Sequence, residues 1–464
     1  MPDLDPAFSP VRDLAAAIQA GRLSPVDLVD ALLERIKRHD GKLHAYVTVY
    51  GDDARNAARA AEGAIRSGHA AGPLHGIPVA LKDIVDLDGR VTTGGSYALK
   101  DRVSTVTATL AKKLIAAGMI VIGKTHSVEF AMGGWGTNEH MGTPWNPWDA
   151  TVHRAPGGSS SGTGVAVSAG LAPWGIGTDT GGSVRLPSSW CGLAGLKTTV
   201  GRVSCHGVLP LASTLDTPGP MARSVEDAAL LYNAMQGPDP LDPMTRGVAF
   251  ADPLPQMKRG AAGLRLALMP AQERSGVDPE VLAAFDTSVE KLRELGASVE
   301  EVPLPCAFAA MGSMAGDIIG AEGYHFVGDL VDDMDLPIDR DVRPRIWRGR
   351  DMTARAYLDT LKRRADLIRD FATALAGYDA LLTPTTATPA PAVREIDQSG
   401  TPAGFTRMVN ILDRCALAVP NGFTKTGLPT SLHIVCAGYD EAMALRIGWA
   451  YEQATEWTAR RPPL

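Results

Sequence analysis

The stretch from Gly157 to Thr199 is the feature of this sequence that most constrains its fold. It reads GGSSSGTGVAVSAGLAPWGIGTDTGGSVRLPSSWCGLAGLKTT and is dominated by small residues. We expect a Gly/Ser-rich loop after Pro156, a helix of small residues over 162–170 and a second glycine-rich loop over 175–182. Because small residues let neighbouring backbones approach closely, these segments can pack tightly against other elements.

Strand and helix patterns alternate along the rest of the chain. Short apolar runs predict strands over 74–86, 119–122, 264–269, 298–302, 380–382 and 431–436. Apolar residues near a spacing of 3.6 predict helices over 10–39, 108–117, 223–236, 279–295, 353–375 and 440–453. This alternation is typical of α/β proteins, and there is no internal repeat or low-complexity linker. We therefore predict one large α/β domain over 1–464 rather than three domains of about 150 residues.

Composition excludes several classes of protein. The chain has 464 residues, of which 45% are hydrophobic and 21% charged, so a disordered or coiled-coil protein is excluded. Its net charge of -7 argues against nucleic acid as a partner. No apolar run approaches the roughly 18 residues of a membrane span. The first residues, MPDLDPAFSP, do not resemble a secretory signal, so we expect a cytoplasmic protein with no membrane partner.

Cysteine and histidine patterns give no sign of a metal centre. The five cysteines are scattered singly and fit neither a disulfide framework nor a zinc site. The ten histidines form no HExxH motif. We predict no metal and no cofactor. Cys191 is expected to be a packing residue rather than a nucleophile, because no histidine is paired with it.

Two short motif matches suggest other functions. Gly118 to Thr125 fits the letters of the phosphate-binding GxxxxGK[ST] loop, which would make the chain a nucleotide-binding enzyme using Gly123, Lys124 and Thr125. Its middle is apolar and favours a strand followed by a turn. Residues 158–162, GSSSG, fit the GxSxG nucleophile elbow, with Ser160 as nucleophile, but the preceding TVHRAP is a poor buried strand.

The Gly157–Thr199 stretch, together with GPLHGIPVALKD around Lys82, resembles the amidase signature family of serine hydrolases. The resemblance extends to LSPVDLVDALLERI, GKTHSVEFAMG, STLDTPGPMARSVEDAAL and GLPTSLHIV. It implies a triad of Ser183 as nucleophile, Ser159 as bridging serine in a cis peptide bond with Gly158, and Lys82 as base. It also implies the fold: a large single-domain α/β structure whose mixed central β-sheet is flanked by helices on both faces.

The residue types fit acyl transfer. A serine hydroxyl needs a base, and since no histidine lies in these segments, a neutral lysine is the candidate. Lys82 follows an apolar strand, where desolvation favours the uncharged amine. The backbone N–H groups of Thr180, Gly181, Gly182 and Ser183 are our candidate oxyanion hole. Asp179, Arg185 and Asp216 are expected to orient this loop through hydrogen bonds.

The resemblance also implies a substrate pocket. The segment after GKT would line the acyl pocket, with Met132, Gly133, Gly134 and Trp135 as substrate-binding residues, and Met132 and Trp135 suggest an apolar or aromatic acyl group. The alternative is that both side chains belong to the core. Within the single domain we expect a helical lead-in over 1–70, a catalytic core over 74–220 and a helical segment over 305–375 that covers the substrate site.

Two amide-cleaving functions remain open. Glutaminase subunits of tRNA-dependent amidotransferases commonly carry an acidic residue in a D-x-x-T pattern, and the matching residues here are Ala403-Gly404-Phe405-Thr406. Without that acid, we favour a free-standing amidase that cleaves a small-molecule amide to an acid and ammonia or an amine through an acyl-enzyme on Ser183. The glutamine-hydrolysing subunit is the alternative, and the sequence leaves room for a homodimer.

Overall fold

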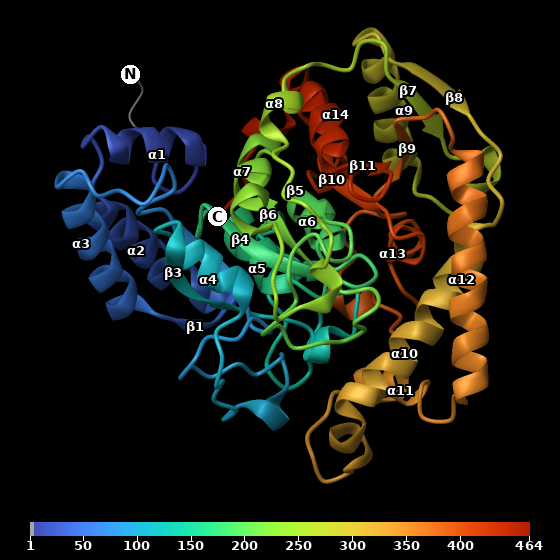
Figure 1. Cartoon of the computed structure of the whole chain (residues 1–464), viewed down its shortest axis with the longest axis horizontal. Helices are drawn as coiled ribbons and strands as arrows, with labels where there is room; N and C mark the ends of the chain where they lie inside the picture. The colour runs from blue at the N-terminus through green and yellow to red at the C-terminus, as the bar shows by residue number, and fades with distance from the viewer. Residues whose placement is uncertain (1–3) are drawn as a thin grey trace.

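A single mixed sheet of 11 strands organises residues 4–464, which the computed structural model describes (Figure 1). The order across the sheet is β1-β3-β2-β4-β6-β5-β10-β11-β9-β7-β8. The strands are β1 (Tyr46–Val49), β2 (Pro78–Lys82), β3 (Ile120–Thr125), β4 (Trp174–Asp179), β5 (Ala194–Lys197), β6 (Thr217–Ala222), β7 (Arg265–Leu268), β8 (Ser298–Glu301), β9 (Ala380–Pro384), β10 (Cys415–Phe423) and β11 (Pro429–Cys436).

Parallel pairing is confined to two regions of the sheet. Strand β2 pairs in parallel with β3 and β4, and β7 pairs in parallel with β8 and β9. The pairs between β4 and β9 across the centre are antiparallel. Every residue of β2, β4, β5, β6, β9 and β11 is buried. The apolar runs without alternation in these strands therefore reflect burial on both faces.

The helices pack around this sheet. They are α1 (Val11–Gln19), α2 (Pro25–Leu43), α3 (Gly51–Arg66), α4 (Thr109–Ala116), α5 (Ser161–Ser168), α6 (Arg185–Cys191), α7 (Val225–Met235), α8 (Leu254–Met257), α9 (Pro279–Glu294), α10 (Phe308–Asp332), α11 (Val342–Trp347), α12 (Ala354–Ala374), α13 (Arg407–Ile411) and α14 (Glu441–Gln453). The start of α2 follows from local chemistry, because Ser24 accepts the Val26 amide at 3.0 Å and Pro25 occupies the first turn.

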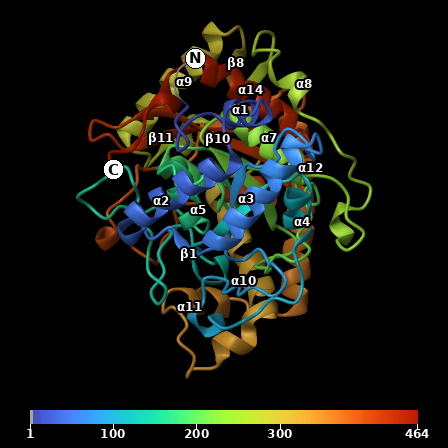
Figure 2. The same ribbon diagram turned by 90° about the vertical axis from the view of Figure 1, so that its left-hand side faces the viewer.

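Two groups of helices cover the two faces of the sheet. Helices α5 and α6 contact each other and the central strands, whereas α7, α9 and α14 form a separate group over β10, β11 and β6. Helices α2 and α3 lie side by side at the end of the molecule that carries β1 (Figure 2). At the opposite end, α10, α11 and α12 stand away from the N-terminal helices (Figure 1). The predicted fold class is confirmed.

Each strand and helix predicted above overlaps an observed element of the same type. The loop predicted over 175–182 is wrong in its first half, because Trp174–Asp179 form strand β4. A Cβ atom on Gly175 would lie 2.6 Å from Thr163 Cγ2, and one on Gly177 would lie 2.8 Å from Met221 Sδ. These glycines thus allow side chains to pack closely on a strand and do not form a turn.

The nucleotide-binding alternative is also wrong. Residues Ile120–Thr125 form strand β3, and Lys124 is fully buried with its Nζ 3.2 Å from Asp83 Oδ1. A phosphate-binding loop needs exposed backbone amides and an accessible lysine, and this segment offers neither. None of the helices within residues 4–464 is long and apolar enough to cross a membrane.

Candidate active site

Lys82 is the last residue of β2 and carries its amine into the interior of the protein. Its Nζ donates a hydrogen bond to Ser159 Oγ at 2.7 Å and to Thr178 Oγ1 at 2.9 Å. Burial lowers the pKa of Lys82 to about 7, although the negative charges of Asp216 and Asp179 act to raise it. The side chain can therefore lose its proton near neutral pH, as a general base must.

Ser159 lies in the loop that precedes α5. The Gly158–Ser159 peptide bond is cis, as the resemblance implies. The next residue, Ser160, is fully buried, and its hydroxyl bonds to the backbone of Thr178, donating to the carbonyl oxygen at 3.3 Å and accepting the amide at 3.2 Å. Because these bonds tie Ser160 to β4, Ser160 is a structural residue and the GxSxG interpretation is not supported.

Ser183 lies between β4 and α6 and lines a cavity of about 180 Å³. Within residues 4–464 its hydroxyl has no hydrogen-bond partner, and its side chain is 7% exposed overall. Gly182 precedes it with φ of +136°, a conformation that favours glycine. A Cβ atom on Gly182 would collide with Thr406 Oγ1. Glycine is thus required for the turn that presents the Ser183 hydroxyl.

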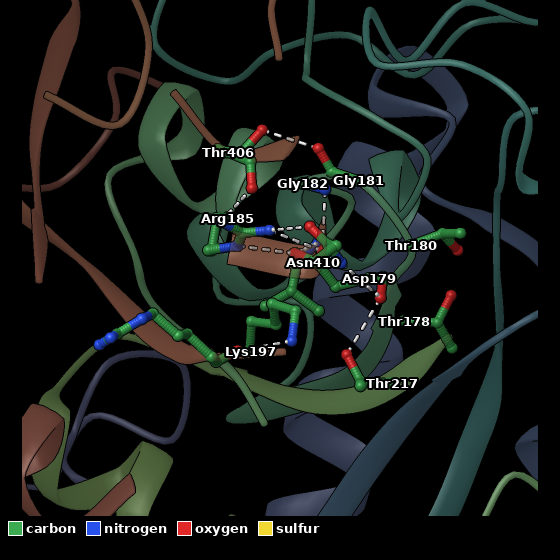
Figure 3. Close-up of polar contacts among 12 residues, drawn as sticks. Thr178, Asp179, Thr180, Gly181, Gly182, Arg185, Lys197, Thr217, Thr406 and Asn410 are labelled. Atoms are coloured by element: carbon green, nitrogen blue, oxygen red, sulfur yellow. Dashed lines mark hydrogen bonds and ion pairs between the residues drawn. The ribbon is translucent and has the colours of Figure 1, made fainter. Parts of the chain in front are cut away.

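A buried network around Asp179 and Arg185 holds this turn in place (Figure 3). The Asp179 carboxylate accepts two hydrogen bonds from Arg185, at 2.8 and 2.9 Å, and the Val184 amide at 3.1 Å. Burial alone would raise the pKa of Asp179, but the charge and hydrogen bonds of Arg185, together with Lys197 and Asn410, hold this pKa well below its usual range. The orienting roles expected for Asp179 and Arg185 match these contacts.

Residues from the late part of the chain complete the network. Arg185 also donates to Asn410 Oδ1 at 2.8 Å and to the Thr406 carbonyl at 2.9 Å, and Thr406 Oγ1 donates to the Gly181 carbonyl at 2.7 Å (Figure 3). The loop before Ser183 is therefore fixed on both sides. Thr406 entered the sequence analysis only as the last residue of the D-x-x-T comparison, and Asn410 not at all, since no motif connects either residue to a loop more than 200 residues away.

The candidate oxyanion hole needs one correction. The Gly182 amide donates to Asp179 Oδ1 at 2.8 Å, so this donor is engaged inside the protein and does not face the cavity. Within residues 4–464, the amides of Gly181 and Ser183 have no hydrogen-bond partner. Gly181, Ser183 and Thr180 also line the cavity. These three residues keep the predicted role as a hypothesis.

Asp216 lies behind the cavity, next to the same loop. It accepts the Thr180 hydroxyl at 2.5 Å and the amides of Leu211 and Ala212 at 2.9 and 3.0 Å. Burial raises the pKa of Asp216 to about 6 despite these bonds. Its charge therefore changes in the same pH range as that of Lys82.

All four predicted substrate-binding residues, Met132, Gly133, Gly134 and Trp135, line the cavity that contains Ser183. The Trp135 ring stacks on Trp190 with centroids 5.8 Å apart, and its Nε1 donates to the Gly400 carbonyl at 3.3 Å. This cavity, called the inner cavity below, opens into an outer cavity of about 430 Å³. The two share Met132 and several later residues.

The sequence analysis did not find the arginines of this site. Arg345, Arg348 and Arg407 line both cavities, and Arg340 lines the outer one. Arg340 lies just before α11, Arg345 in α11, Arg348 directly after it and Arg407 in α13. No motif marks them, and only the fold brings them to Ser183. Among residues 4–464 there is no group of histidine, cysteine, aspartate and glutamate side chains that could hold a metal ion.

The fold and the site define an enzyme that hydrolyses carbon–nitrogen bonds. The family model "Amidase" matches residues 27–445, and the chain belongs to this family. Among curated proteins, it is 37% identical to a glutamyl-tRNA(Gln) amidotransferase subunit of Chloroflexus aurantiacus, with 97% of each chain covered.

Solved structures agree with this assignment. The peptide amidase of Stenotrophomonas maltophilia is 31% identical, with a TM-score of 0.86 and 98% of each chain covered. The corresponding glutamyl-tRNA(Gln) amidotransferase subunit of Thermotoga maritima is also 31% identical, with a TM-score of 0.82 and coverage of 98% of this chain and 96% of that one. The match extends over nearly the whole chain in both cases.

Proposed function

We propose that this protein is an amidohydrolase that cleaves a small-molecule amide through an acyl-enzyme on Ser183. The observation that carries the proposal is the 2.7 Å hydrogen bond between the fully buried Lys82 Nζ and Ser159 Oγ. The residue after Ser159, Ser160, donates its amide to the Ser183 carbonyl at 3.3 Å, which ties this loop to that of Ser183. A serine hydroxyl needs a base before it can attack an amide carbon. Lys82, with a pKa of about 7, is proposed as that base, and the Ser159 hydroxyl is proposed to pass the proton to it.

The proposed reaction has two halves. Neutral Lys82 takes a proton from Ser159, which takes one from Ser183 as the Ser183 oxygen bonds to the amide carbon. The amides of the Thr180–Ser183 turn that face the cavity stabilise the oxyanion, and the C–N bond then breaks as Ser159 returns the proton to the leaving nitrogen. Water attacks the acyl ester in the second half by the same proton path, which releases the acid and regenerates Ser183.

The helical segment over 305–375 is proposed to cover the substrate site. Ile319 of α10, Arg345 of α11 and Arg348 line the cavity opposite the Ser183 turn. These side chains can bind the part of the substrate that does not react.

A free-standing amidase is favoured over a glutamine-hydrolysing subunit. Ala403 lines the cavity at the position where the D-x-x-T pattern would place an acid. Without that acid, the inner cavity lacks a partner for the ammonium group of glutamine. The alternative rests on the curated relatives, which are named as amidotransferase subunits. Ammonia release from simple amides by the isolated chain, with no release from glutamine, would support the first function.

The nucleophile can be tested directly. Ser183→Ala should abolish amide hydrolysis without unfolding the protein, whereas the same change at Ser161, the first residue of α5, should retain most activity. A fluorophosphonate should add its mass to a peptide that contains Ser183 and not to Ser160. Retention of activity in Ser183→Ala, or labelling at Ser160, would refute the proposal.

A further inference from the structure

The three arginines that line the inner cavity differ in how their guanidinium groups are bound. Arg348 donates twice to Asp317 Oδ1, at 3.0 and 2.7 Å. Arg345 donates to the Met132 carbonyl and to both oxygens of Gln398. Arg407 makes one hydrogen bond, from Nη1 to the Gly312 carbonyl at 3.1 Å. Arg407 therefore has the most unused donors of the three.

Arg407 lies directly beside the loop that carries the nucleophile. A Cβ atom built on Gly181 would lie 3.4 Å from Arg407 Cγ and 3.8 Å from its Nε. The preceding residue, Thr406, donates to the Gly181 carbonyl at 2.7 Å, which fixes this neighbourhood. A group bound to Arg407 would thus be part of the same small molecule that reacts at Ser183.

The charge of Arg407 is not balanced by the protein. Neither Arg407 nor Arg345 has a carboxylate oxygen within 4.0 Å in the part of the chain that the structure describes, and no acidic residue of that part lines the inner cavity. Asp317 is bound to Arg348, and Asp341 lines the outer cavity beside Arg340 and Arg345. Burial, followed by repulsion from Arg348 and Arg345, lowers the pKa of Arg407 to about 10.

Arg407 is half-buried, and an unpaired cation that is partly removed from water is unfavourable unless something neutralises it. A planar guanidinium with free N–H groups matches a carboxylate, which it can bind with two parallel hydrogen bonds. The inner cavity of about 180 Å³ is well above the roughly 10–15 Å³ that one water needs on this measure, so it has room for a short acyl chain. Such a chain would span from Ser183 to Arg407.

We propose that the acyl part of the substrate ends in a carboxylate that binds Arg407, so that the protein hydrolyses monoamides of short dicarboxylic acids. This inference rests on the proposed amidohydrolase function. It differs from the expectation of an apolar or aromatic acyl group, which considered Met132 and Trp135 alone. Arg345 and Arg348 add positive potential, and the absence of an acid at Ala403 means that a substrate ammonium is not required.

The substrate preference of the unaltered protein is the first test. Succinamate and butanamide are a matched pair in which a carboxylate replaces a methyl group, and glutaramate and pentanamide form a second pair. We expect kcat/KM for each carboxylate to exceed that of its uncharged partner by about 10- to 100-fold, the usual range for a hydrogen bond to a charged group. Equal rates within both pairs, or preference for the uncharged amides, would overturn the proposal.

The residue is tested by Arg407→Met and Arg407→Lys. Arg407→Met should remove the preference mainly by raising KM for the carboxylate substrates, while butanamide hydrolysis persists. Arg407→Lys should retain part of the preference, and it keeps the test valid if the methionine variant does not fold. Arg355→Met is the matched control, because Arg355 is exposed on α12 and lines neither cavity. Equal loss in Arg355→Met would refute the assignment to Arg407.

A binding measurement separates this inference from the proposed function. Titration calorimetry of Ser183→Ala with succinate and glutarate needs no turnover. Dicarboxylate binding that Arg407→Met abolishes would support the carboxylate site even if no amide were hydrolysed. Amide hydrolysis without such binding would leave the amidohydrolase function standing and refute the site. Inorganic phosphate binding as well as the dicarboxylates would show a general anion site and also overturn the proposal.

Discussion

The amine of Lys82 sets the pH dependence that the proposed mechanism predicts. Its pKa is lowered to about 7 by burial, and only the uncharged amine can accept a proton. We expect kcat/KM to rise with pH through about 7 and to fall about tenfold for each pH unit below this value. Lys82→Arg should be inactive at every pH, since a guanidinium stays protonated. A flat profile across this range would contradict the role of Lys82.

Asp216 should tune this profile. Its negative charge is the first of the two carboxylate charges that raise the pKa of Lys82, and its own pKa is raised by burial to about 6. Asp216→Asn removes the charge and should lower the pKa of Lys82 further, so the rising limb of kcat/KM moves to lower pH. The difference should shrink below about pH 6, where Asp216 is already protonated.

The control for this shift is Asp359→Asn on the exposed side of α12. It removes the same charge far from any site residue and should leave the profile unchanged. A rising limb that moves to higher pH in Asp216→Asn would contradict the electrostatic argument. An unmoved limb with lower kcat would assign Asp216 a purely structural role through Thr180.

Single residues that carry a motif could be predicted from the sequence, whereas their partners could not. Lys82, Ser159 and Ser183 stand in recognisable segments, and the structure brings them to one region. Thr178, which accepts the second hydrogen bond of Lys82, lies in the Gly157–Thr199 stretch but was not singled out there, and Arg407 stands in no motif that marks it. Their roles depend on strand pairing and loop contacts, which residue spacing does not reveal.

At the scale of elements, the turn between β4 and α6 decides whether the nucleophile is presented. Gly182→Ala should strongly reduce activity, because its φ of +136° disfavours alanine and its Cβ would collide with Thr406. A displaced oxyanion donor typically costs a factor of about 100 to 1,000 in kcat. We expect a loss in that range, and kinetics with an unchanged near-UV circular dichroism spectrum would locate the effect in the turn.

Gly404→Ala is the matched control for this turn. Gly404 precedes Thr406 in the adjoining segment, and a Cβ atom there would meet nothing within 4 Å. The variant should keep the activity of the unaltered protein. Equal activity of Gly182→Ala and Gly404→Ala would mean that the turn tolerates a side chain and that its geometry is not critical.

Buried central elements were the ones hardest to define from the sequence. The Gly175–Gly177 segment has the composition of a loop but is strand β4, because its glycines serve packing against Thr163 and Met221. Strands β5, β6 and β10 were not among the predicted strands either. The amino-acid composition of a segment indicates how flexible its backbone is locally. The conformation of these strands is instead determined by contacts with residues far away in the sequence.

The whole molecule is built by joining the two halves of the chain side by side in one sheet: β1–β6 form one side, β7–β11 form the other, and they meet where β5 pairs with β10. Strand β10 from the C-terminal part pairs with β5, and β11 then leads through β9 to β7 and β8. The same C-terminal part supplies Thr406 and Asn410 to the network of Arg185. The segment over 74–220 contains the proposed triad. On its own, however, it would leave the β5 edge without its partner strand β10, and the turn that carries Ser183 would lose the contacts of Thr406 and Asn410.

The pairing of β5 with β10 predicts that the first half of the sheet does not fold alone. A chain that ends at residue 400 loses β10, β11 and α14, which exposes the buried edge of β5 and leaves the Asp179–Arg185 pair without Asn410. Exposed unpaired edges and apolar faces favour aggregation, so we expect no cooperative urea transition and no near-UV circular dichroism signal.

Removal of residues 462–464 alone is the control and should preserve both signals, because these residues lie outside every strand and helix. Cooperative unfolding of the chain that ends at 400 would mean that the first half of the sheet is an independent domain, and would contradict the single-domain fold.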